Sequence, residues 1–356
     1  MSDDRRPQKN SAGLLAGACV WLILASISNA QQSPLKRFEF SRIEMGVDFR
    51  VALYASDSEV ASNAASAAFD RVHDLNNVMS DYESSSELMR LCATSKPGKP
   101  VVVSPELMIV LSHSQLVATA SNGAFDVTLG PVTKLWRRAR RQMELPAADD
   151  LQQARASVGF QFLRLSPQDR SVELLKPEMR LDLGGIAKGY AADEALKILR
   201  AKGISRALVA ASGDIAVGDP PPGKVGWIVE VESLTRKNVP DLSLKLANQA
   251  VSTSGDAYQS VEIAGRRYSH IVDPKTGLGL EQRSSVTIIA ATGMQADALA
   301  TAVTVLGPEA GLELVRSGKA GQAEALCVRL DEHNRPVRHA TAKFATFVVD
   351  GAATEK

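Results

Sequence analysis

The stretch Leu181–Tyr190 reads LDLGGIAKGY, and it places two glycines between a short apolar segment and an amphipathic segment. This pattern predicts a strand over Met179–Leu183 and a helix that begins at Ile186 and ends before Gly203. Glycine lets a backbone approach a ligand closely, and a helix start carries unpaired N–H groups and partial positive charge. The stretch therefore indicates either a phosphate site, to which Lys188 adds a positive charge, or only a tight strand-to-helix turn.

Outside this stretch, predicted strands and helices are mixed without regular alternation. Helical spacing of apolar residues predicts helices over Ser58–Met79, 104–120 and Ala296–Leu306. The predicted strands are Met45–Tyr54, Ala207–Ala211, Trp227–Val231, Leu242–Leu246, Ser260–Ile263 and Val286–Ala290. Such a mixture favours an α+β fold over a doubly wound parallel sheet. The proline-rich segment 219–223 is interpreted as a surface connection, not a domain break.

Composition is that of a soluble globular protein. The chain has 356 residues, 45% of them hydrophobic, and a formal net charge of +1. This charge gives no reason to expect nucleic acid as a partner. Basic residues do cluster at Lys134–Arg141 (KLWRRARR), which we interpret as a solvated helix face.

The first thirty residues resemble a secretory signal. Basic residues precede an apolar run over 12–27, and the small residues Ser28 and Ala30 follow it. We expect cleavage after Ala30, a single domain over 31–350, a polar tail over 351–356 and a periplasmic location. An uncleaved inner-membrane anchor is the alternative. In an exported protein Cys92 and Cys327 could pair, but the sequence leaves this open.

A candidate metal site lies in the predicted helix near the C-terminus. Asp297 and Thr301 are four residues apart and therefore share one helix face. A carboxylate and a hydroxyl are both oxygen ligands of the kind that Mg²⁺ prefers. The alternative is an acidic residue that complements the helix dipole, beside an unrelated threonine.

Polar and glycine-rich turns follow several other predicted strands. His270 precedes the turn over 274–277, although a lone histidine is more often structural than catalytic. Phe125 lies in GAFDVTLG at 123–130 and could either stack on an aromatic ligand or belong to the core. Small polar turns follow at 212–214 and 252–256. From these residues alone, the chain is a phosphate- or metal-binding α+β protein.

Read in order, these segments resemble the FAD:protein FMN transferase family, also called the ApbE family. The motifs that carry the resemblance are MG at 45–46, SDYESSSELMRLC at 80–92, GAFDVTLGP at 123–131, DLGGIAKGYAAD at 182–193, SGD at 212–214, STSGD at 252–256, SHIVDPKTG at 269–277 and ADALATAVTVLG at 296–307. One departure is Ala211, which precedes Ser212-Gly213-Asp214 where the family more often has two glycines before the acid.

The resemblance implies a two-lobed α+β fold with mixed or antiparallel sheets and a flavin site between the lobes. The implied FAD-binding residues are Met45, Tyr82, Ala124, Phe125, Asp126, Asp182, Lys188, His270 and Ile271. The implied Mg²⁺ ligands are Asp297, Thr301 and the backbone of Gly185.

The activity implied by the resemblance is Mg²⁺-dependent transfer of the FMN moiety of FAD to a threonine or serine hydroxyl of a target flavoprotein, with release of AMP. On chemical grounds Asp256 and His270 are the candidates for accepting the hydroxyl proton. Two alternatives stay open: a Mg²⁺-dependent FAD pyrophosphatase, and a non-catalytic periplasmic FAD-binding protein. Export suggests that the acceptor is a membrane-associated redox subunit facing the periplasm.

Overall fold

The computed structural model describes residues 34–349 except 236–238 and 256–259. The predicted signal over 1–30, the predicted tail over 351–356 and the candidate base Asp256 lie outside the described residues. Residue contacts group the chain from Pro34 onward into one compact unit. No helix in the described ranges has the length and apolar character that a membrane crossing requires.

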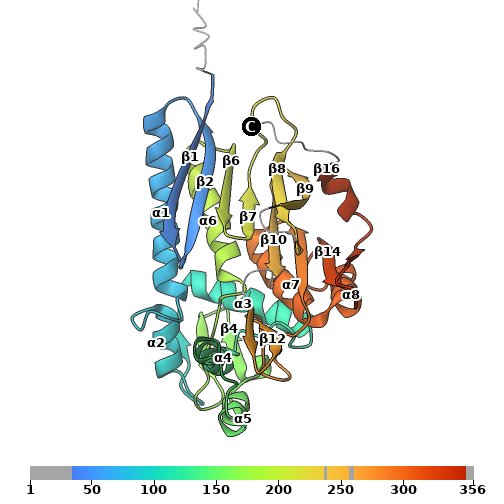
Figure 1. Ribbon diagram of the computed structural model, residues 1–356. Coiled ribbons are helices and arrows are strands. Elements are labelled where there is room, and N and C mark those ends of the chain that lie inside the picture. The colour runs from blue at the N-terminus through green and yellow to red at the C-terminus, as the bar shows by residue number, and fades with distance from the viewer. Residues whose placement is uncertain (1–33, 236–238, 256–259, 350–356) are drawn as a thin grey trace, which may run out of the picture. The chain divides into compact units, whose positions relative to one another are not determined.

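An eight-stranded antiparallel sheet runs through the described part of the chain (Figure 1). Its strands, in spatial order, are β1 (Lys36–Glu44), β2 (Val47–Ala55), β6 (Ala207–Ala211), β7 (Asp214–Val217), β10 (Gln249–Gly255), β13 (Ser284–Ala290), β14 (Ala323–Leu330) and β15 (Pro336–Ala340). Met45 and Gly46 join β1 to β2 with φ angles of 49° and 75°. Positive φ at both central residues is the turn geometry that matches the twist of a hairpin.

The main hydrophobic core lies between this sheet and a layer of helices. These helices are α1 (Ser58–Met79), α6 (Ala187–Ala201), α7 (Gly293–Leu306) and α8 (Pro308–Ser317). Successive residues of β2 point to opposite faces of the sheet. Val51 and Leu53 belong to this core, whereas Ala52 belongs to a second core on the other face. Asp57 caps α1 by accepting a hydrogen bond from the Val60 N–H at 2.9 Å.

A second core lies on the opposite face of the large sheet. It is covered by a three-stranded sheet of β8 (Trp227–Glu232), β9 (Pro240–Leu246) and β16 (Val348–Val349), beside the 3-10 helix η2 (Phe344–Phe347). The ring centroids of Trp227 and Tyr54 lie 5.9 Å apart in this core. The proline-rich segment 219–223 connects β7 to β8, as predicted.

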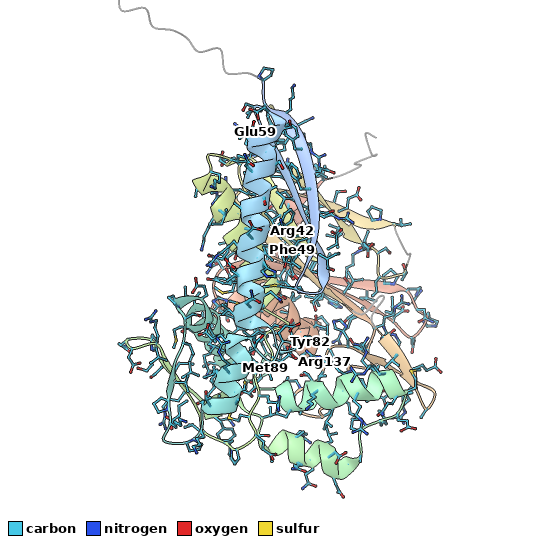
Figure 2. All side chains as sticks on the ribbon, turned by 90° about the vertical axis from the view of Figure 1, so that its left-hand side faces the viewer. Arg42, Phe49, Glu59, Tyr82, Met89 and Arg137 are labelled. Carbon is cyan, nitrogen blue, oxygen red and sulfur yellow. The ribbon has the colours of Figure 1, made fainter. Side chains whose placement is uncertain are left out.

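The remaining elements gather at one end of the large sheet, drawn at the bottom of Figure 1, and we call them the cap. They are α2 (Glu87–Thr94), β3 (Val101–Val102), α3 (Pro105–Ala120), α4 (Gly130–Gln142), α5 (Ala148–Ala156), η1 (Phe160–Phe162), β4 (Leu163–Ser166), β5 (Ser171–Leu174), β11 (Ser260–Ile263) and β12 (Arg266–Ser269). A third hydrophobic cluster centres on Trp136 of α4 and Tyr268 of β12, whose rings meet edge to face. In Figure 2, Tyr82 and Arg137 lie beside each other where the cap meets α1.

The predicted α+β class with antiparallel sheets is confirmed, and α1 occupies the predicted range. The strand predicted over Met179–Leu183 is wrong. Apolar residues alternate there because Met179, Leu181 and Leu183 are buried in the core, not because the segment pairs within a sheet. Its backbone instead donates hydrogen bonds to a side chain of α2 and to a loop, since the Leu181 N–H donates to Cys92 Sγ and the Asp182 N–H donates to the Val127 carbonyl.

Two further predicted element boundaries differ from those in the structure. Met45 was placed inside a strand, whereas it forms the hairpin turn and β2 begins at Val47. The helix α7 begins at Gly293, before the predicted Ala296. Cys92 and Cys327 are both free thiols, and Cys327 is buried in β14.

Candidate active site

A cleft of about 1460 Å³ opens where the cap meets the large sheet. It exceeds the range of roughly 300–1,000 Å³ that is usual for small-molecule pockets, so it can hold a ligand of dinucleotide size. Its walls come from the β1–β2 turn, the end of α1, α4, the start of α6, the β6–β7 turn and α7.

The cleft collects all of the sequence-predicted site residues that the structure describes. They are Met45, Tyr82, Ala124, Phe125, Asp126, Asp182, Gly185, Lys188, His270, Ile271, Asp297 and Thr301. These residues come from segments spread over more than 250 positions of sequence, and only the fold brings them to one place. Asp256, the remaining candidate, lies outside the described residues.

Lys188 stands at the centre of a buried charge cluster. Its Nζ lies 2.5 Å from Asp214 Oδ2 and 3.6 Å from Asp297 Oδ2. Asp214 is 3% exposed, and its Oδ1 accepts a hydrogen bond from Ser252 Oγ at 2.6 Å. One lysine therefore faces two carboxylates, and the cluster carries one negative charge in excess when all three groups are ionised.

Burial, the largest cause, and the negative charge of Asp214 together raise the pKa of Asp297 to about 7, against the opposing effect of the Lys188 ammonium. Burial acts to lower the pKa of Lys188, but the two carboxylates outweigh it and hold that pKa above its usual range. The lysine therefore stays charged, while Asp297 ionises more readily if another cation comes close.

Asp297 of this cluster, the Thr301 hydroxyl and the Gly185 backbone are oxygen donors of a kind that suits Mg²⁺. A Cβ built on Gly185 would lie 2.9 Å from Thr301 Oγ1, so the glycine backbone lies directly against that hydroxyl. Asp297 lies one helical turn before Thr301, and both line the cleft. A carboxylate, a hydroxyl and a backbone carbonyl form a hard donor set, and the excess negative charge beside them favours a cation. These residues fit a magnesium ion.

A close approach of α6 and α7 sets this geometry. A Cβ on Gly189 would lie 2.1 Å from the Gly293 carbonyl oxygen and 2.9 Å from Asp297 Cβ. The Gly189 N–H also donates to Asp297 Oδ2 at 3.2 Å. Glycine at 189 is thus required for the two helices to meet, and their contact positions the Asp297 carboxylate.

The turn before α6 offers a phosphate fewer free N–H groups than its sequence suggests. The Gly184 N–H donates to Asp182 Oδ1 at 2.9 Å. The Ile186 and Ala187 N–H groups both donate to the Leu183 carbonyl. A phosphate group at this turn would therefore be neutralised more by nearby cations than by helix-start amides.

Asp126 uses both carboxylate oxygens within the protein. Its Oδ1 accepts from the N–H and the hydroxyl of Thr128, at 2.8 and 2.7 Å, and its Oδ2 accepts from the Phe160 N–H at 2.9 Å. Burial raises the pKa of Asp126 despite these bonds. Phe125 is only 4% exposed, and a Cβ on Gly185 would meet its ring at 3.4 Å. Both residues shape the wall around the Gly185 turn.

His270 is placed on the cleft wall by a network that involves α4. The Trp136 indole N–H donates to the Ser269 carbonyl at 3.0 Å. The Ser269 N–H donates to the Leu280 carbonyl at 2.7 Å, and the Ile271 N–H donates to Ser269 Oγ. The backbone on both sides of His270 is therefore held firmly beside the cleft.

Sequence reasoning gave no role to two residues of this site. Asp214 was seen only as part of a polar turn, although it pairs with Lys188. Arg137 was placed on a solvated helix face, an interpretation that suits the exposed Arg138 but not Arg137, which lines the cleft. Helical spacing could have placed Arg137 in the site, because Thr133, Arg137 and Arg140 share one face of α4 and all three line the cleft.

Comparison with known proteins places the sequence in a family. The sequence pattern of the ApbE family matches residues 45–327. The FAD:protein FMN transferase of Escherichia coli (strain K12) is 30% identical over 278 residues, which are 76% of this chain and 79% of that protein. That of Vibrio cholerae serotype O1 is 30% identical over 295 residues, or 81% of this chain and 87% of that protein.

Solved structures show the same relationship. The flavin transferase ApbE from Vibrio cholerae superposes with a TM-score of 0.78 at 27% identity, covering 88% of this chain and all of that one. The apo form of the Pseudomonas stutzeri flavinyl transferase ApbE gives a TM-score of 0.77 at 29% identity, covering 89% of this chain and 98% of that one. Because the family match extends over most of the chain and the fold agrees along its length, this protein belongs to the ApbE family.

Proposed function

We propose that this protein transfers the FMN moiety of FAD to a threonine or serine hydroxyl of an acceptor flavoprotein, releases AMP and requires Mg²⁺. Relatives that align with most of the chain are named FAD:protein FMN transferases. The observation that carries the proposal is the cleft that collects the implied FAD-binding residues beside an oxygen-rich, negatively charged cluster.

FAD is the substrate, and its size matches the cleft. Tyr82 offers an exposed aromatic ring at one wall, where a planar flavin can stack. The Gly184–Gly185 turn offers a backbone without side chains at the level of the diphosphate. Met45 lines the cleft from the β1–β2 turn and adds apolar contact.

Asp297, Thr301 and the Gly185 backbone would hold the magnesium ion. When bound there, Mg²⁺ neutralises negative charge on the phosphate oxygens of FAD, which lowers the barrier to attack at phosphorus. Asp214 holds the ammonium of Lys188 at 2.5 Å, so that Asp297 stays available to the metal on its other oxygen.

In the reaction, the acceptor hydroxyl oxygen forms a new bond to the FMN phosphorus. The bond from that phosphorus to the oxygen of the AMP phosphate breaks, and AMP leaves with the bonding electron pair. The hydroxyl proton passes to a base, for which His270 on the cleft wall and Asp256 are the candidates. Removal of one such group is expected to slow transfer by ~10²–10⁴-fold.

The direct test combines the purified protein with FAD, Mg²⁺ and a candidate acceptor domain that contains a threonine. Covalent flavin fluorescence on the acceptor after denaturing electrophoresis, with one AMP released per flavin attached, is the expected result. AMP release without labelled acceptor would instead show an FAD pyrophosphatase. FAD binding without AMP release would show a non-catalytic FAD-binding protein.

The N-terminal sequence supports a further part of the proposal, namely export to the periplasm and an acceptor that is a membrane-associated redox subunit facing that compartment. Cell fractionation is expected to find the protein in the periplasmic fraction with a new N-terminus after Ala30. Recovery in the cytoplasmic fraction with an intact N-terminus would contradict this location.

A further inference from the structure

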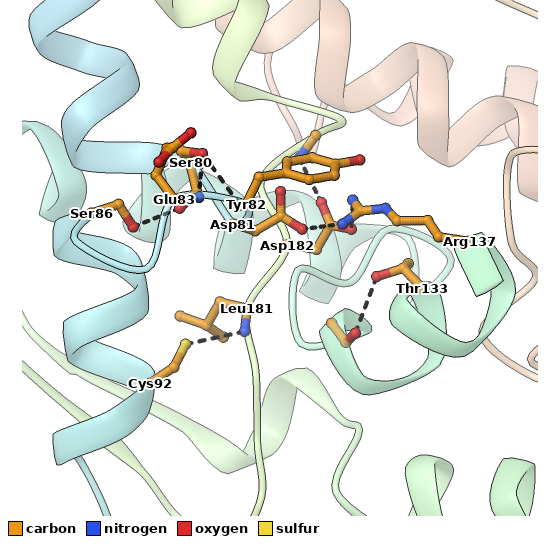
Figure 3. Close-up of polar contacts among 12 residues, drawn as sticks. Ser80, Asp81, Tyr82, Glu83, Ser86, Cys92, Thr133, Arg137, Leu181 and Asp182 are labelled. Carbon is orange, nitrogen blue, oxygen red and sulfur yellow. Dashed lines mark hydrogen bonds and ion pairs between the residues drawn. The ribbon is translucent and has the colours of Figure 1, made fainter. Parts of the chain in front are cut away.

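Arg137 reaches from α4 into the cleft and contacts three residues (Figure 3). Its Nη1 donates to Asp81 Oδ2, and its Nη2 donates to Asp182 Oδ2 at 2.8 Å. Its Cζ lies 4.4 Å from the centroid of the Tyr82 ring. One guanidinium therefore joins the loop after α1, the helix α4 and the segment before α6.

The contact with Asp182 continues to the metal-binding turn. Asp182 Oδ2 binds Arg137, while its Oδ1 accepts from the Gly184 N–H at 2.9 Å. The next residue, Gly185, lies against the Thr301 hydroxyl. Because both oxygens of Asp182 are held, the position of the turn depends on the guanidinium that anchors one of them.

The contact with Tyr82 controls an aromatic wall of the cleft. Tyr82 is 74% exposed as a residue, so core packing does little to hold its ring. The guanidinium covers one face of the ring, and Asp81, the preceding residue, is bound by the same group. These two contacts restrict the ring and leave its other face open for stacking on a planar ligand.

We propose that Arg137 is a positioning residue for FAD, which holds the Tyr82 ring and the Asp182–Gly184 turn in their binding geometry through its two ion pairs and its stacking contact. The inference rests on the proposed function and adds to it a residue that acts on substrate binding through others. A planar, forked cation suits this role because it can bind two carboxylates and cover a ring at once, which a lysine cannot do.

The same helix supplies a matched control. Arg138 is exposed, is not among the residues that line the cleft, and donates to Gln142 Oε1, at 3.0 Å, one turn along the helix. Arg137→Gln and Arg138→Gln remove the same charge from adjacent positions of α4. Any difference between the two variants therefore reports the contacts of Arg137 and not the charge of the helix.

The experiment measures the dissociation constant of FAD with Mg²⁺ present, the quenching of flavin fluorescence on binding, and the KM and kcat of FMN transfer. Arg137→Gln is expected to raise the dissociation constant and the KM for FAD roughly tenfold or more, the loss that accompanies one charge-assisted hydrogen bond. We expect a smaller change in kcat at saturating FAD, and weaker quenching because the Tyr82 ring is no longer held. Arg138→Gln is expected to match the parent.

Two further variants keep the inference testable if Arg137→Gln does not fold. Arg137→Lys should bind FAD less tightly than the parent, and a lysine variant with parental affinity would overturn the inference. Tyr82→Leu should lose most of the quenching. A parent protein that binds no FAD would overturn the proposed function together with the inference, whereas a parent that binds FAD while Arg137→Gln behaves like Arg138→Gln would overturn the inference alone.

Discussion

The contact between Gly189 and Gly293 gives the sharpest test of how α6 and α7 build the site. In Gly189→Ala the new carbon would lie 2.1 Å from the Gly293 carbonyl oxygen and 2.9 Å from Asp297 Cβ. Alanine improves intrinsic helix propensity by ~1 kcal/mol over glycine. Overpacking costs ~1–3 kcal/mol in typical cores, and here the obstacle is backbone of another helix, which no side-chain rotation can move away.

The clash should therefore outweigh the gain in propensity, and we expect the free energy of unfolding to fall by ~1–2 kcal/mol, with a Tm lower by ~2–6 °C. Mg²⁺-dependent transfer should fall as well, because separating the helices moves the Asp297 carboxylate and its bond from the Gly189 N–H. Urea unfolding and a Mg²⁺ titration of transfer measure the two effects.

Gly184→Ala is the matched control for stability. Its new carbon would meet a side-chain oxygen, Asp182 Oδ1, at 3.1 Å and not the backbone of another helix, so the free energy of unfolding should change little. A Gly189→Ala protein as stable as its parent, with an unchanged Mg²⁺ requirement, would refute the close-packing argument.

Three other predictions concern charge. Asp297→Ala or chelation of Mg²⁺ should abolish FMN transfer while FAD still binds. Full transfer by the variant would show that Asp297 is not a metal ligand. Asp214→Asn removes one negative charge beside Lys188, so half-maximal transfer should need about tenfold more Mg²⁺, a change of ~1.4 kcal/mol in binding; an unchanged titration would contradict this. Asp193, which accepts the Gly293 N–H at 2.7 Å, has a pKa raised by burial from 3.8 to about 6. The Asp193 carboxyl therefore binds its proton more tightly in the folded protein than in the unfolded chain. The stability that protonated Asp193 contributes is present below pH 4 and is lost as the pH rises to about 6. Relative to its parent, Asp193→Asn should gain up to ~3 kcal/mol in unfolding free energy between pH 4 and 7, and a difference that does not vary with pH would count against the raised pKa.

Local sequence patterns correctly predicted much of the secondary structure. The spacing of apolar residues marked α1 and α3, and turn residues marked the ends of β6 and α7. The α+β class followed from the irregular order of these elements. The motifs, taken with the family resemblance, also named the residues that line the cleft, because each motif is a short contiguous turn whose chemistry is visible in its letters.

Only the tertiary structure decided how these motifs meet and which side chains are engaged by others. Met179–Leu183 has the alternation of a strand, but burial alone produces it, since no local pattern records whether a neighbouring strand is available for pairing. Lys188 looked like a free cation, whereas it is held by Asp214, which begins β7 26 positions away. Arg137 looked like one of several surface charges.

The physical reason is that sequence periodicity reports the forces acting along one segment, chiefly apolar burial and backbone conformation. Ion pairs, close helix contacts and the walls of a cleft form between segments that are remote in sequence, as Gly189 and Gly293 are. Leu181–Tyr190 thus determined by itself a glycine turn and a helix start. The approach of α7 and the charges of Asp214 and Asp297 decided that this turn adjoins a buried, negatively charged cluster, because the energies that place them arise only when the chain is folded.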